Sequence, residues 1–222
     1  VLAGYDFTGA GNPSVTLEHP DATASDWTSG PGMSAFFPDS EGDTTGLDAD
    51  GRSIFASQRG SMISSRGLGA TSGTEAAAFA DGDYFTMTID PDSDLHMDLT
   101  SFTFRASRRG NSRANPDWTL TSSIDGHTPA NAIASGTITV TDPNTYQNII
   151  VDLSDGQFQS LRDVVEFRLY LYGTSGGPNS ATLTTFDNIV INGRVYPVPE
   201  PSSVLLAGLG AGGLLCRRRR RT

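Results

Sequence analysis

The chain contains no lysine, a single cysteine and only three histidines among its 222 residues. All 15 basic side chains are arginines, and five of them stand together near the chain end. Residues 1–197 carry 10 arginines against 24 acidic side chains, a formal charge of −14. Such a surface repels nucleic acid and anionic membranes. We therefore expect no nucleic-acid partner, and a surface better suited to divalent cations or neutral glycans.

The scarcity of cysteine excludes a disulfide framework. The one cysteine, Cys216, lies in the final 25 residues, so the rest of the chain has no thiol to pair with. A domain of about 195 residues is long enough to bury a core without such a staple.

Sustained helical periodicity is also missing, and many short β-rich segments take its place. In one of the clearest, Phe102 and Phe104 alternate with Thr103 and Arg105, as expected of a strand with one buried face. The predicted strands are Tyr5–Thr8, Arg52–Ala56, Tyr84–Asp90, Leu95–Ala106, Trp118–Ser123, Gly136–Val140, Gln147–Leu153, Val164–Tyr172 and Thr182–Val195. The fold class predicted is all-β: an antiparallel two-sheet β-sandwich (jelly roll), plus a short C-terminal hydrophobic helix.

Turn-forming pairs separate these segments. They are Asp81-Gly82, Asp90-Pro91, Asp125-Gly126, Asp142-Pro143 and Asn192-Gly193. The Gly/Ser-rich region Ser57–Gly73 is predicted to be a long loop, and Asp155–Val165 to include a helical turn. Trp118 lies in a predicted strand and is expected in the core.

The predicted organisation has four parts: 1–3, a signal-peptide remnant; 4–195, the sandwich ectodomain; 196–201, a linker; and 202–222, a hydrophobic segment with an Arg-rich tail. The first part rests on Val1-Leu2-Ala3 before Gly4, which fits the small-residue rule of signal peptidase. An arbitrary fragment start is the alternative.

The C-terminal segment has the layout of a sorting signal. The motif Pro199-Glu200-Pro201 is expected to be extended because of its two prolines, so a helix can begin only after it. From Ser202 to Cys216 no residue is charged, and a helix of that length would span roughly 22 Å, short of a hydrocarbon core of about 30 Å. The segment ends in a membrane-stop block that stays in the cytoplasm. This block is Arg217, Arg218, Arg219, Arg220 and Arg221.

This order of motif, apolar stretch and arginine block closely resembles the PEP-CTERM sorting signal of Gram-negative bacteria. The resemblance implies a secreted protein that is held transiently in the inner membrane and processed by an exosortase. It further implies a final place at the cell surface or in an extracellular matrix of exopolysaccharide. Pro199, Glu200 and Pro201 match the recognition motif. The resemblance covers only about 24 residues, and here the apolar segment is short and glycine-rich.

Several strand segments, such as Asp83–Ile89 and Phe186–Ile189, also resemble PEP-CTERM ectodomains, which are similar to jelly rolls of carbohydrate-binding modules and lectins. Many of those hold a structural calcium between the first strand and the start of the last. By that resemblance Asp6 and Asp187 are the calcium candidates, since carboxylates are hard oxygen ligands. The alternative is that Asp187 caps a turn.

Glycan binding needs exposed aromatic rings flanked by hydrogen-bonding side chains. Tyr170 and Tyr172 alternate with the apolar positions of their strand and, with Arg168, are predicted to line a concave face. Ordinary packing at a sheet surface is the alternative for all three.

Signals for catalysis are weak. His19, His96 and His127 are isolated, lack metal-site spacing and are expected to be exposed. The leading hypothesis is a non-enzymatic exosortase substrate at the cell surface or in the biofilm matrix. The alternatives are a carbohydrate-binding module and a jelly-roll glycoside hydrolase or lyase, which would need two carboxylates facing each other across a groove.

Overall fold

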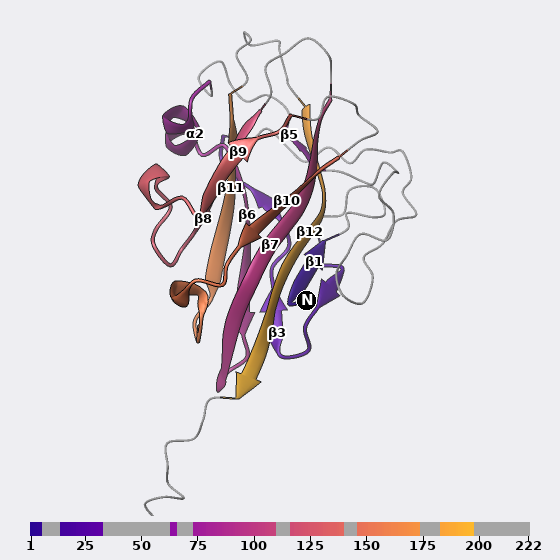
Figure 1. The fold of residues 1–222 in the computed structure, drawn as a ribbon, viewed down its shortest axis with the longest axis vertical. Helices are drawn as coiled ribbons and strands as arrows, with labels where there is room; N and C mark the ends of the chain where they lie inside the picture. Colours follow the sequence, from indigo (N-terminus) through magenta and orange to yellow (C-terminus); the bar gives the residue numbers. More distant parts are fainter. Residues whose placement is uncertain are drawn as a thin grey trace, which may run out of the picture.

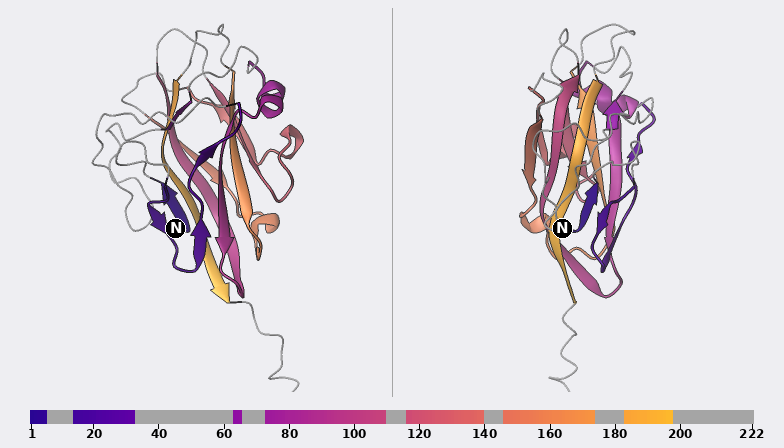
Figure 2. Two further views of the ribbon diagram at one scale, coloured as in Figure 1. Left: turned by 180° about the vertical axis from the view of Figure 1, so that it is seen from behind. Right: turned by 90° about the vertical axis from the view of Figure 1, so that its right-hand side faces the viewer.

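The computed structural model describes residues 1–5, 14–32, 63–65, 73–109, 116–139, 146–173 and 183–197, with the backbone alone for 63–65, 107–109, 183–185 and 187. The described strands form two antiparallel sheets packed face to face (Figures 1 and 2). The predicted two-sheet antiparallel sandwich is therefore confirmed. The predicted C-terminal hydrophobic helix and the predicted strand Arg52–Ala56 lie outside the described residues.

Sheet A has the order β10-β7-β12-β1-β2, and β5 also pairs with β12. Its two longest strands, β7 and β12, run antiparallel over almost their full length. The strands of sheet A are β1 (Ala3–Tyr5), β2 (Leu17–Glu18), β5 (Ile63–Ser65), β7 (Leu95–Arg109), β10 (Gln147–Asp152) and β12 (Leu183–Pro197).

Sheet B has the order β3-β6-β11-β8-β9, and β4 also pairs with β6. Its strands are β3 (Ala22–Ala24), β4 (Thr28–Ser29), β6 (Tyr84–Pro91), β8 (Asp117–Ser122), β9 (Ala134–Thr137) and β11 (Val165–Tyr172). Short helical elements are α2 (Glu75–Asp81) and the 3-10 turns η1 (Pro129–Asn131) and η2 (Gly156–Phe158). The turn η2 confirms the helical turn predicted in Asp155–Val165.

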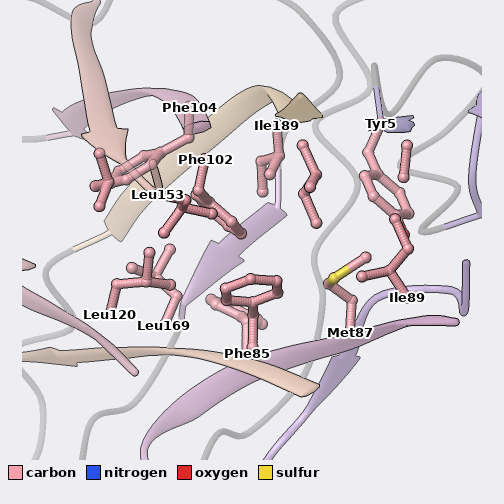
Figure 3. Packing of buried hydrophobic residues seen from close by; sticks show 14 of the residues in the cluster. Tyr5, Phe85, Met87, Ile89, Phe102, Phe104, Leu120, Leu153, Leu169 and Ile189 are labelled. Atoms are coloured by element: carbon pink, nitrogen blue, oxygen red, sulfur yellow. The ribbon is translucent and has the colours of Figure 1, made fainter. Parts of the chain in front are cut away.

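The core fills the space between the two sheets, because alternate positions of each strand point inward. Phe102 of β7 meets Phe167 of β11 with ring centroids 5.4 Å apart, and Phe104 meets Trp118 at 5.2 Å. Figure 3 shows Phe102 and Phe104 on one side of this space, with Phe85, Leu120 and Leu169 on the other. Trp118 is buried, as predicted.

The N-terminal residues pack in the sandwich. Ala3 begins β1, Leu2 is fully buried, and the Leu2 amide donates to the Ile191 carbonyl at 2.8 Å. β1 lies directly beside β12, with Tyr5 opposite Ile189. The sandwich therefore begins before residue 4, where the prediction placed its start. The origin of residues 1–3 as a signal-peptide remnant stays a prediction.

The last strand is longer than predicted and contains the pair Asn192-Gly193, which was predicted to be a turn. That prediction is wrong: β12 continues through it with a register shift and ends at Pro197. A Cβ on Gly193 would lie 2.2 Å from the Asp98 carbonyl oxygen. The glycine therefore serves a close backbone approach at a bulge, not a chain reversal.

The sequence patterns also missed α2 and the shortest strands. Thr74 caps α2 through its Oγ1, which accepts from the Ala77 amide at 3.3 Å, and Gly82 ends the helix in the left-handed conformation with φ of 77°. Seven residues are too few to show a helical period. The strand β5 lies inside the predicted loop Ser57–Gly73, so that prediction is wrong for Ile63–Ser65.

Candidate functional site

The outer face of sheet B, meaning the face turned away from sheet A, carries rows of polar and aromatic side chains. The register of β6, β11 and β8 sets these rows, because directly opposed residues point to the same side. In order along β11 the rows are Thr88 with Glu166; Thr86, Arg168 and Thr121; Tyr84, Tyr170 and Thr119; and Tyr172 with Asp117.

The centre of this face is a polar cluster formed by Glu166, Arg168, Thr86, Thr121 and His127. The Arg168 Nε donates to Glu166 Oε1 at 2.7 Å, and the Thr86 hydroxyl donates to the same oxygen at 2.9 Å. His127 reaches over from the loop after β8. Its Nδ1 lies 2.8 Å from Thr121 Oγ1, and its Nε2 lies 3.7 Å from Glu166 Oε2.

The polar cluster is close to neutral in charge, on a domain that is otherwise strongly acidic. Burial alone would raise the pKa of Glu166, but hydrogen bonds from Arg168 and Thr86 outweigh it and lower that pKa. Burial and the nearby Arg168 cation lower the pKa of His127. Near neutral pH the cluster therefore holds one carboxylate, one guanidinium and one neutral imidazole.

Helix α2 covers the end of this face that carries Tyr170. The ring of Phe79 stacks on the Tyr170 ring with centroids 3.7 Å apart and an interplanar angle of 9°. The Thr119 hydroxyl donates to Glu75 Oε1 at 2.7 Å and lies 2.9 Å from the Tyr172 hydroxyl. Two contacts from one short helix thus cover Tyr170 and Thr119 of the third row.

The prediction that Tyr170 stands free to stack on a ligand is wrong. It does point away from the core, but Phe79 covers its ring and leaves it 2% exposed. Tyr172 and Arg168 lie on the same face and are half-buried. For these two side chains glycan binding stays a prediction.

Sequence reasoning missed two contributors to the face. Phe79 lies in helix α2, whose four alanines favour a helix once Thr74 caps it. His127 was predicted to be exposed and without a role, yet it packs on Thr121. The run of alanines could have predicted α2. No local sequence pattern, however, links His127 to Glu166 of β11, which lies 39 residues later in the chain.

His96 was also predicted to be exposed, and it is 8% exposed. Its ring lies beside the Tyr196 ring with centroids 5.5 Å apart. This prediction failed because the partner is 100 residues away in sequence. In the described part of the chain no group of three or more His, Cys, Asp or Glu side chains is placed to hold a metal.

The predicted calcium ligands fall at the limit of the described structure. Asp6 lies outside it, and for Asp187 only the backbone is described, opposite Arg105. The next residue, Asn188, has a left-handed backbone with φ of 48° and is 4% exposed. Its Oδ1 and Nδ2 atoms are both buried, and no described residue hydrogen-bonds to either. A buried amide without partners is costly. Calcium binding beside Asp187 stays a prediction.

The fold defines a two-sheet all-β domain whose last strand leads directly into the C-terminal segment. A model of the PEP-CTERM protein-sorting motif matches residues 197–221. The chain therefore carries a PEP-CTERM sorting motif, which includes the predicted Pro199, Glu200, Pro201 and the five arginines. Those residues lie outside the described structure, and among the described ones no helix is long and apolar enough to cross a membrane.

Two further comparisons, with curated sequences and with solved structures, show no family for the sandwich. No curated protein matches the chain in sequence. Among solved structures, a CBM4 structure aligns with a TM-score of 0.38 at 12% identity, covering 76% of this chain and 94% of that one. The K1 cleaved adhesin domain of Lys-gingipain from Porphyromonas gingivalis W83 aligns with a TM-score of 0.36 at 14% identity, covering 85% and 96%.

An exo-beta-agarase also aligns, with a TM-score of 0.41 at 11% identity, covering 88% of this chain and 24% of that one. Likeness at this level says nothing of ligand or activity. The sandwich assignment rests on the strand pairing of the chain itself.

Proposed function

We propose that this chain is an exported, non-enzymatic surface protein, delivered and processed by an exosortase through its C-terminal motif. The observation that carries the proposal is the sorting motif at residues 197–221, joined directly to the last strand of a β-sandwich. The acidic residues 1–197 face outward, while the arginine block stays on the cytoplasmic side until cleavage. Fractionation of cells that produce the chain with and without residues 198–222 tests this proposal.

A non-enzymatic role agrees with the state of Glu166, the carboxylate at the centre of the polar cluster. A glycosidase acid needs a raised pKa so that it holds a proton to donate. Arg168 and Thr86 lower the pKa of Glu166 instead. The hydrolase alternative is therefore disfavoured for this carboxylate. We expect an activity screen to find no degradation of polysaccharide by the protein.

A second proposed function is the binding of a neutral polysaccharide at the polar cluster. Three features support it: a charge-balanced set of donors and acceptors, the half-buried Tyr84 ring, and Arg168 4.5 Å above that ring. Such sites combine ring surfaces with a few fixed polar groups. An overall acidic surface disfavours anionic polysaccharides by repulsion.

Replacing Arg168 with alanine is expected to weaken retention on a neutral polysaccharide by about tenfold, because it removes a charge-assisted hydrogen-bonding group. Affinity electrophoresis over a panel of neutral polysaccharides measures the effect. Arg162→Ala is the matched control, since Arg162 is exposed and stands outside the cluster. Equal retention of both variants, or no retention of the wild type on any polysaccharide, argues against binding here.

A structural calcium at Asp6, Asp187 and Asn188 is a further proposal, supported by the buried amide of Asn188 without partners. At a 100-fold excess over its dissociation constant, calcium would stabilise the fold by about 2.7 kcal/mol. We expect EDTA to lower the melting temperature of the wild type, and Asn188→Ala to reduce that response. Asn148→Ala, at an exposed position of β10, is the control. An unchanged melting temperature in EDTA would show that no calcium stabilises the domain.

A further inference from the structure

The end of β12 is held by more than strand pairing. β12 leaves the sandwich at Pro197, where the sorting motif begins. Figure 1 shows this end of β12 at the lower pole of the domain, away from α2 at the upper end. The start of β7 lies beside it, with Asp98 opposite Arg194 and His96 opposite Tyr196.

Asp98 connects three chain segments at this pole. Its Oδ2 accepts from Arg194 Nε at 2.9 Å and from Nη2 at 2.7 Å. Its Oδ1 accepts from the Ser160 amide at 2.7 Å and from the Tyr196 hydroxyl at 3.0 Å. One carboxylate thus receives four hydrogen bonds from β12 and from the loop after η2.

The carboxylate is buried, whereas its cationic partner is not. Asp98 is 4% exposed, and the Arg194 side chain is 75% exposed. Burial alone would raise the pKa of Asp98, but the bonds from Ser160, Arg194 and Tyr196 outweigh it and lower that pKa. The ionised form is therefore the one that the surrounding donors are arranged to hold.

The loop residue Ser160 shows how closely this contact is specified. Its backbone is in the left-handed region with φ of 57°, which is uncommon for a residue other than glycine. Its hydroxyl lies 3.0 Å from the Tyr196 hydroxyl, and the adjoining Leu161 forms a two-way backbone bridge with Met97. Such a conformation persists where the surroundings determine it.

Strand ends normally fray, and frayed ends are the sites where proteases act. We propose that Asp98, with Arg194, Tyr196 and Ser160, forms an end lock that fixes the C-terminal boundary of the fold. After cleavage of the C-terminal segment, the end lock prevents exopeptidases from degrading β12 and prevents β12 from separating from β7. It does not depend on any ligand of the outer face of sheet B.

The test is the position at which a carboxypeptidase that accepts proline stops on the full 222-residue chain. Mass spectrometry gives the length of the remaining fragment. For the wild type we expect trimming to stop within a few residues of Pro197. Asp98→Asn keeps the size of the side chain but removes the charge, and we expect trimming to pass Arg194 and continue into β12. Tyr196→Phe removes the hydrogen bonds of the Tyr196 hydroxyl to Asp98 and Ser160 but leaves the Arg194 contact in place, and it should give an intermediate stop.

Ser101→Ala is the matched control. It removes a hydrogen bond between the same two strands, from Asn192 Nδ2 to Ser101 Oγ at 3.1 Å, at a position further from the exit. This variant should stop at the wild-type position. Amide hydrogen exchange at residues 194–196 should be about tenfold faster in Asp98→Asn than in the wild type. The assay temperature should lie well below the melting temperature of both chains.

Two results would overturn the end lock. One is a common stop position for the wild type and Asp98→Asn. The other is trimming of the wild type itself into β12. If Asp98→Asn fails to fold, Tyr196→Phe still decides the question, because its stop position and its exchange rates are measured independently.

Discussion

Replacing Phe102 with alanine lowers the free energy of unfolding by about 3–5 kcal/mol, the largest loss of stability that we expect from one side chain in this domain. Phe102 is fully buried between the sheets. Its ring contacts Phe167 of sheet B at 5.4 Å, Trp27 at 6.3 Å and its neighbour Phe104 at 6.1 Å. Truncation removes the contacts of one ring with three others and leaves a cavity that no single neighbour can fill.

Urea denaturation measures this loss as a shift of the midpoint at unchanged slope. In a domain of this size, each kcal/mol also lowers the melting temperature by about 2–4 °C. Ile150→Ala is the control, because Ile150 lies on β10 with 75% of its surface exposed, and its loss should stay within about 0.5 kcal/mol. A loss below about 1 kcal/mol for Phe102→Ala would mean that the sheets do not pack through this ring.

Much of the fold was predictable, because long strands of a sandwich leave a two-residue period in the sequence. β6, β7, β8, β10, β11 and β12 all follow predicted segments to within a few residues. The pattern could not reveal β2, β3 and β4, which have two or three residues each and no period to detect. These strands form only because β1 and β6 offer edges to pair with.

The side chains of the candidate site were harder to interpret than the strands that carry them. Alternation along β11 places Arg168, Tyr170 and Tyr172 on the outer face, as predicted. It cannot tell that a helix from another part of the chain covers Tyr170, since the Phe79 contact spans 91 residues. Likewise, nothing local in sequence marks Asp98 as the partner of Arg194 and Tyr196. Those contacts depend on the register of β7 with β12, which bulges shift twice.

The sorting motif was predictable for a different reason. It is a linear signal, in which a short extended motif, an apolar stretch and a basic block are read in order along the chain. No tertiary contact is needed to recognise it, and the match at residues 197–221 confirms it. The sorting motif could therefore be recognised from the sequence more directly than any ligand-binding residue.

Deleting residues 198–222 is expected to abolish retention at the cell surface while leaving the sandwich as stable as before. The last described strand ends at Pro197, and Asp98 binds Arg194 and Tyr196 close to that end. The truncation therefore removes no contact between described residues. The removed apolar stretch contains four glycines, each costing about 0.8–1.0 kcal/mol of helix propensity relative to alanine. We therefore expect it to be ordered mainly in a membrane, where the arginine block holds its end on the cytoplasmic side.

Cell fractionation and thermal melting of the purified chains measure the two halves of this prediction. The truncated chain should appear in the medium instead of at the surface, with a free energy of unfolding within about 0.5 kcal/mol of the full chain. A full-length variant with Glu200 replaced by alanine is the matched control: it keeps the apolar stretch and the arginines, and should stay in the inner membrane uncut. The sorting hypothesis would be wrong if the truncated chain unfolds, if it is retained at the surface, or if mature surface protein still carries Arg217 to Arg221.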